Sequence, residues 1–257
     1  MKNRVIYYKD ELHDDFKEIG LKRPPLKENY KFKRENWFNN LLSNFLYYCI
    51  AKPAFYIFNF FSGVKYHNVK YLKQFKKEGL FIYANHTSFY DVYTIQACVV
   101  KGKRTNIVGY SDTTSLPIVK HIARALGYLP LPSDFNNIKR FQEALEFYIK
   151  DKKENILIFP EAHIRPYYTK IRHFESASFH YPAKLMAPVI PIVTTYRKRR
   201  FLKKPGMDIR VGKVIYPKEN LTLRENKIYL AEECYKQMVE IANSVPQYEY
   251  IKYIKQE

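Results

Sequence analysis

Cysteine is scarce in this chain, and its few cysteines are poorly placed for pairing. Cys49, Cys98 and Cys234 lie far apart in apolar contexts, so neither a disulfide framework nor a zinc site is expected. The sequence also lacks a Gly-x-Ser-x-Gly elbow and a phosphate-binding glycine loop, which disfavours a serine hydrolase and a nucleotide-dependent enzyme. Because the cysteines show no pairing pattern, a reducing cytoplasm is the expected setting.

Acidic side chains are in short supply as well. The chain has 25 Asp and Glu residues against 44 Lys and Arg, which gives a formal net charge of +19. This excess indicates an anionic partner: nucleic acid, a membrane surface or a phosphorylated substrate. No recognised nucleic-acid motif is present, so we expect no nucleic acid partner. The first 20 residues contain no apolar segment and carry acidic residues from the start, so no secretory signal sequence is expected.

No apolar run is long enough to span a bilayer, which takes about 20 residues. The most apolar and aromatic stretch, residues 37–63, is interrupted by Asn, Ser and Lys residues and is broken near its middle by Pro53. We expect it to form two amphipathic helices that lie in a membrane interface, with a pair of core helices as the alternative. Residues 1–36 are basic and contain Pro24 and Pro25, so they are expected to form a leader partly ordered against the domain.

Residues 64–257 have the pattern of an α/β domain. Apolar runs typical of buried strands alternate with stretches of helical periodicity, and the chain is long enough to bury one sizeable core. Helices are expected over residues 136–150, capped by Ser133 or Asp134, and over residues 225–243. The expected fold class is α/β, with a mixed, largely parallel sheet flanked by helices.

One short stretch carries a candidate catalytic pair. In FIYANHTSFYDVYTI, residues 81–95, a histidine and an aspartate stand five positions apart, directly after a predicted strand. This spacing fits neither one face of a long helix nor the alternation of a strand. It fits a tight turn over residues 85–88 followed by a helix from Phe89, which gathers His86 and Asp91 at the first helical turn. A carboxylate beside an imidazole fixes the tautomer of the ring, so the pair has the composition of a general base.

Three blocks of sequence together resemble the glycerolipid acyltransferase family of lysophosphatidic acid acyltransferases. The family's Asn-His-x4-Asp motif is matched at residues 85–91, and its proline-rich apolar strand at residues 188–193. Its Phe-Pro-Glu-Gly-Thr-Arg motif is matched only in the first three positions, at residues 159–161. The resemblance covers about residues 37–215.

The resemblance implies a membrane-associated enzyme of phospholipid biosynthesis. Such an enzyme moves a fatty acyl group from acyl carrier protein (acyl-ACP) or acyl-CoA to the hydroxyl of a lysophospholipid, with lysophosphatidic acid as the first expectation. Neither a cofactor nor a metal is expected. The protein should lie on the cytoplasmic face of the cell membrane, peripheral or monotopic, in contact with anionic lipid.

The resemblance also implies roles for individual residues. His86 and Asp91 are expected to be catalytic, and backbone N–H groups at the start of the following helix are expected to stabilise the oxyanion. The expected substrate-binding residues are Asn85, Glu161, Arg165, Lys170, Arg172 and Arg124.

The chain departs from the family pattern where an acceptor phosphate should bind. Ala162 and His163 replace Gly-Thr, and the arginine comes one residue late, as Arg165. The second motif, usually Gly-x-Ile-Phe-x-x-Arg, is altered to GYLPLPSD, so Arg124 is a possible substitute for its arginine. Other functions therefore stay open: acylation of glycerol 3-phosphate or of a non-phosphorylated alcohol, or a non-catalytic basic protein that binds lipid or nucleic acid.

Overall fold

The computed structural model describes residues 4–10, 25–98, 103–111 and 117–256 of the chain. Its centre is a sheet of seven strands: β2 (Lys65–His67), β3 (Phe81–Ala84), β4 (Thr105–Gly109), β5 (Tyr128–Pro130), β6 (Asn155–Ile158), β7 (Val189–Arg197) and β8 (Gly206–Val211). The strand order is β2-β8-β7-β3-β6-β4-β5. Neighbouring strands are parallel except β7 and β8, which are antiparallel. The expected mixed, largely parallel sheet is confirmed.

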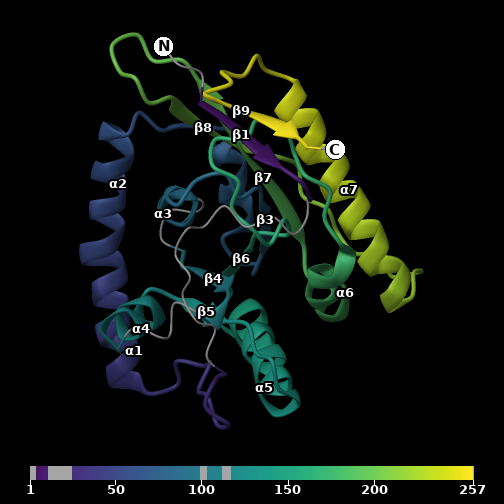
Figure 1. Ribbon diagram of the computed structural model, residues 1–257. Coiled ribbons are helices and arrows are strands. Elements are labelled where there is room, and N and C mark those ends of the chain that lie inside the picture. Colours follow the sequence, from purple (N-terminus) through teal and green to yellow (C-terminus); the bar gives the residue numbers. More distant parts are fainter. Residues whose placement is uncertain (1–3, 11–24, 99–102, 112–116, 257) are drawn as a thin grey trace.

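Helices cover both faces of this sheet (Figure 1). The α-helices are α1 (Trp37–Phe45), α2 (Lys52–Phe61), α3 (Asp91–Cys98), α4 (Pro117–Ala125), α5 (Phe135–Glu146), α6 (His180–Leu185) and α7 (Leu223–Asn243). Short turns of other helix types are η1 (Leu46–Ala51), η2 (Val69–Phe75), η4 (Phe147–Asp151) and η5 (Ser176–Phe179). The helix expected over residues 136–150 is α5 continued by η4, and Asp134 caps it by accepting from the backbone N–H of Asn137.

The core is divided by the sheet into two layers. Successive strand residues point to opposite faces: Ile156 and Ile158 of β6 join a cluster with α5, α6 and α7. Leu157 between them joins the other cluster, with η2 and with Ile95 of α3. Because β6 has helices on both faces, it reads in the sequence as a continuous apolar run.

The segment expected to form two separate helices is one continuous helical stretch. Between α1 and α2 the chain passes through η1, a π-helical turn, whose first and last residues, Leu46 and Ala51, keep right-handed helical dihedral angles. Pro53 lies in the first turn of α2. A proline ring crowds the carbonyl four residues back, and here the backbone N–H of Lys52 bonds five residues back, to Tyr47. Pro53 therefore changes the hydrogen-bond spacing without ending the helix.

This helical stretch packs on the domain through its polar side. Ser43, Tyr47, Lys52 and Asn59 are buried, and the Ser43 hydroxyl donates to the carbonyl of Ala125 at 2.6 Å. The opposite side is exposed, so the segment packs on the domain along one side only. No helix within the described residues is long and apolar enough to cross a bilayer. The exposed large side chains are Trp37, Phe38, Leu41, Leu42, Phe45, Ile50, Tyr56, Ile57, Phe60 and Phe61.

Parts of the expected leader belong to the folded domain. β1 (Arg4–Tyr8) pairs in parallel with β9 (Ile251–Lys255), forming a small second sheet (Figure 1). The side chains of Phe32 and Arg34 are buried in the main domain. Residues 11–24, with Pro24, lie outside the described residues. The pairing of the two ends of the chain was not predicted, because each strand alone is short and half polar.

The turn after β6 holds a residue in a left-handed conformation. Ala162, where the resembling family has glycine, has a φ of 60°. A left-handed conformation costs a residue with a Cβ atom roughly 1–2 kcal/mol. The backbone of this turn therefore keeps the shape suited to glycine although the glycine itself is gone.

Replacing Ala162 with glycine should raise the free energy of unfolding by about 0.5–1 kcal/mol, because the relief of the steric cost exceeds the added entropy of the unfolded chain. Urea unfolding, followed by circular dichroism, measures this change in the free energy of unfolding. The matched control is Ala54→Gly, at an exposed right-handed position of α2, where glycine should cost up to about 1 kcal/mol. Equal destabilisation by both substitutions would contradict the prediction.

Candidate active site

His86 and Asp91 lie together where β3 ends and α3 begins. The ring Nδ1 of His86 is 3.4 Å from Oδ2 of Asp91. The Asp91 side chain is fully buried, whereas 21% of the His86 side chain is exposed. Asp91 is the first residue of α3, where the helix dipole favours a negative charge. The sequence spacing predicted that His86 and Asp91 lie close together, and in the structure they do. Their catalytic roles stay a prediction.

Asp91 also shapes the turn that carries His86. Its Oδ2 accepts from the backbone N–H of Thr87 at 2.6 Å and from that of Ser88 at 2.8 Å. The sequence led us to expect oxyanion donors at the start of the following helix, and these two N–H groups lie just before it. In the structure they are instead bonded to the carboxylate, which holds the turn closed around the histidine.

Residues of β7 fix the other side of this turn. Asn85 is buried, its amide donates to the carbonyl of Thr194 at 3.1 Å, and its oxygen accepts from the N–H of Thr194 at 2.8 Å. The hydroxyl of Tyr196 lies 2.9 Å from Oγ1 of Thr87. Burial, aided by the charge of Asp91, raises the pKa of Tyr196, so its phenol stays protonated. Sequence reasoning missed Tyr196, because one more aromatic residue at the end of an apolar strand gives no signal.

Glu161 joins the His86 turn to the loop after β6. Its buried carboxylate accepts from the backbone N–H of His86 at 3.3 Å and from that of Arg172 at 3.1 Å. The Arg172 guanidinium, also buried, donates to the same carboxylate through Nη2 at 2.9 Å and Nε at 3.2 Å, and to the carbonyl of His163. Arg172 thus binds Glu161 and does not extend into open space.

The other predicted phosphate ligands are dispersed. Arg165 is fully buried, with its guanidinium 4.3 Å from the ring centre of Tyr8 and 4.9 Å from that of Tyr168. Lys170 is exposed on the same loop. Arg124 is not brought to this site: α4 follows β4 and runs back along the sheet, so its last turn, with Arg124, lines a different cavity.

A cavity of about 710 Å³ opens beside the ring of His86. The ring of Phe159 stacks on that of His86, with 4.3 Å between their centres. Most of the lining is apolar, and its ionisable members among the described residues include no lysine or arginine. No group of three His, Cys, Asp or Glu residues in the described part of the chain is placed to hold a metal ion. The volume is in the range of small-molecule sites, and the apolar lining suits a hydrocarbon chain.

Comparison with known proteins agrees with this geometry. Among solved structures, the fold is similar to the crystal structure of the 1-acyl-sn-glycerophosphate (LPA) acyltransferase PlsC from Thermotoga maritima, with a TM-score of 0.55 and 20% sequence identity over 82% of this chain and 81% of that chain. At this identity the likeness shows a shared fold. No curated protein matches the sequence. A family model described as Acyltransferase matches residues 63–195, more than half of the chain and the part that holds His86, Asp91 and Glu161. The chain therefore belongs to the acyltransferase family.

Proposed function

We propose that this acyltransferase moves a fatty acyl group from acyl-ACP or acyl-CoA to the hydroxyl of a lysophospholipid, with lysophosphatidic acid as the first candidate, in phospholipid biosynthesis. The observation that carries the proposal is the His86–Asp91 pair beside an apolar cavity of about 710 Å³. The cavity offers space for an acyl chain, and the imidazole next to it offers a base for a hydroxyl. Neither part alone would indicate acyl transfer.

The proposed reaction is a direct transfer without an acyl-enzyme. Asp91 keeps a proton on Nδ1 of His86, which leaves Nε2 free to accept the proton of the acceptor hydroxyl. The hydroxyl oxygen attacks the thioester carbonyl, and a tetrahedral oxyanion forms. Its collapse breaks the carbon–sulfur bond, and the imidazolium returns the proton to the departing thiolate. The Nδ1–Oδ2 separation of 3.4 Å is long, as is common before substrate binds.

One observation favours a second candidate acceptor. Because no lysine or arginine of the described residues lines the cavity, an acceptor phosphate would need a cation from outside the lining. Lys170, exposed on the loop after β6, is the candidate we propose. A non-phosphorylated alcohol would need no such cation. Purified protein assayed with acyl-ACP and acyl-CoA against lysophosphatidic acid, glycerol 3-phosphate, other lysophospholipids and monoacylglycerol separates these acceptors.

The proposed place of action is the cytoplasmic face of the membrane, with anionic lipid as the partner. Two exposed features support it. The α1–α2 stretch presents a row of aromatic and aliphatic side chains, including Trp37 and Phe60, which are 75% and 78% exposed. The hairpin between β7 and β8 exposes Phe201 among lysines and arginines, and Arg199 of this hairpin donates to the carbonyl of Ser62, just after α2, at 3.0 Å. Apolar tips flanked by cations suit an anionic interface.

Removing the base should abolish transfer. His86→Ala should lower kcat by about 10²–10⁴-fold, the usual contribution of general base catalysis, and Asp91→Asn should lose most of the activity because the ring loses its tautomer. Thioester consumption is the measurement, and the circular dichroism spectrum checks the fold. His180→Ala, at a histidine that does not itself line the cavity, is the control. A His86→Ala rate within a few-fold of the unmodified protein would rule out His86 as the base. No thioester consumption by the unmodified protein with any acceptor would instead favour a non-catalytic lipid-binding protein.

Replacing Lys170 tests whether this side chain binds the phosphate of the acceptor. If this cation contacts the phosphate equally in the ground and transition states, Lys170→Ala should raise KM for lysophosphatidic acid several-fold and leave kcat and the KM of the thioester nearly unchanged. KM for monoacylglycerol should not move, since it has no phosphate. Lys236→Ala, on α7, is the control for loss of one exposed charge. An unchanged KM for lysophosphatidic acid would remove Lys170 from the acceptor site.

Charges on the exposed side of α1–α2 should release the protein from vesicles. The double variant Trp37→Glu/Phe60→Glu should lower partitioning onto vesicles with anionic lipid at least tenfold, because burying each side chain contributes about 1.5–3 kcal/mol. Phe55 and Phe58 are less suitable sites for a charge, because their rings pack on Tyr93 and Tyr90 of the domain and a charge there would also disturb the fold. Sedimentation with vesicles is the measurement.

The control for this experiment is Ile228→Glu on α7, on the opposite face of the sheet from α3 and 40% exposed. It should sediment like the unmodified protein. If Trp37→Glu/Phe60→Glu also sediments unchanged, the α1–α2 stretch is not a membrane anchor.

A further inference from the structure

A second cavity, of about 850 Å³, lies at the opposite end of the sheet from His86. Arg34, in its wall, donates to Asn106 near the start of β4 at 2.8 Å, whereas His86 lies just beyond the last residue of β3. Because β3 and β4 both run parallel to β6, these positions are at opposite ends of the strands. No residue lines both cavities, so the second cavity is a separate site.

Cations outnumber carboxylates around this second cavity. Two of the cations have acidic partners: Arg34 lies 2.7 Å from Glu154, and Lys33 lies 4.0 Å from Glu35. No carboxylate among the described residues is within ion-pair distance of the others. The basic side chains in its lining are Lys31, Lys33, Arg34, Arg124 and Arg140, against the acidic Glu35 and Glu143.

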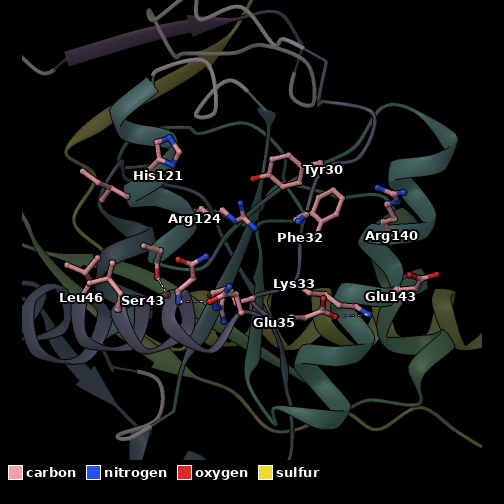
Figure 2. Close-up of a pocket in the computed structure, with 17 residues that line it drawn as sticks. Tyr30, Phe32, Lys33, Glu35, Ser43, Leu46, His121, Arg124, Arg140 and Glu143 are labelled. Atoms are coloured by element: carbon pink, nitrogen blue, oxygen red, sulfur yellow. Dashed lines mark hydrogen bonds and ion pairs between the residues drawn. The ribbon is translucent and has the colours of Figure 1, made fainter.

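Arg124 and Arg140 come from different helices and face one space. Figure 2 shows Arg124 on α4 and Arg140 on α5, with Tyr30 and Phe32 between them. Arg124 is partly buried and lies over the ring of Tyr30, 5.9 Å from its centre. Guanidinium groups from separate helices that line one cavity suit an anion bound in it, because their planar forks match phosphate oxygens.

The edge of the cavity is apolar where it meets α1. Leu42 of α1, Leu46 at the start of η1 and Ile122 of α4 belong to its lining. Leu42 and Ile122 are 49% and 54% exposed. The exposed row of α1, with Trp37 and Leu41, continues from this edge. The cavity thus changes from cationic to apolar toward the surface proposed above to contact membrane, which is the polarity of an anionic amphiphile.

We propose that this second cavity binds the phosphate headgroup of an anionic glycerophospholipid of the surrounding membrane. The phosphate lies near Arg124 and Arg140, and the glycerol and first acyl carbons lie against Leu42 and Ile122. The inference rests on the membrane association proposed above. A lipid bound here is not the acyl acceptor, because His86 lies at the other end of the sheet. Its role is to hold α1 and the domain on anionic lipid.

A short-chain lipid tests the site without any membrane. Dihexanoylphosphatidylglycerol below its micellar concentration should bind the full-length protein in calorimetric titration, and dihexanoylphosphatidylcholine, which has no net charge, at least about tenfold more weakly. Arg124→Gln/Arg140→Gln should weaken binding of the anionic lipid about tenfold or more. Arg124→Lys/Arg140→Lys, which keeps the charges, should retain part of the affinity. The control is Arg224→Gln/Lys236→Gln, two exposed cations on α7, which should bind normally.

Further outcomes distinguish the sources of phosphate. Inorganic phosphate or coenzyme A binding as tightly as the anionic lipid would overturn the lipid assignment in favour of a free phosphate or a donor nucleotide. Equal affinity of the unmodified protein and Arg124→Gln/Arg140→Gln, with the fold intact by circular dichroism, would overturn the site itself. This titration uses neither vesicles nor acyl transfer. If the unmodified protein sediments with vesicles but does not bind the short-chain anionic lipid, the headgroup site alone is rejected. Loss of sedimentation in Trp37→Glu/Phe60→Glu tests the proposed anchor instead.

Discussion

The buried carboxylate of Glu161 is the contact on which the arrangement of the site depends. It accepts from the backbone N–H of His86 on one loop and from the backbone and guanidinium of Arg172 on another. Removing one partner of a buried ion pair costs about 3–5 kcal/mol, since the remaining charge stays in the interior without compensation. Glu161 therefore acts on the position of His86 through the backbone, and its proximity to the base does not require that it touch a substrate.

Asp91 shows how one side chain can meet a structural and a chemical requirement together. A single oxygen receives the N–H groups of Thr87 and Ser88 and lies near the ring of His86. Because those N–H groups hold the carboxylate in place, they are not available to an oxyanion in this state. The same two hydrogen bonds hold the turn closed around His86.

Patterns that depend on local sequence were predictable, and those that depend on distant contacts were not. Strands buried on both faces and the His86–Asp91 spacing could be read directly, because each reflects neighbouring residues. The ion pair of Arg172 with Glu161 and the pairing of β1 with β9 depend on chain segments meeting in space. The effect of Pro53 was also misjudged, because a π-helical turn can take up a proline that would interrupt regular α-helical bonding.

That continuity of α1 and α2 links the two ends of the sheet. α1 borders the cationic cavity through Leu42, while α2 packs on α3, the helix that begins with Asp91. A helix broken at Pro53 would leave these two contacts free to move separately. With the helix unbroken, a membrane that met its exposed row, as proposed, would be positioned relative to both cavities at once. The proposed headgroup site and the proposed base would then act on the same surface, one holding the protein in place and the other meeting its acceptor there.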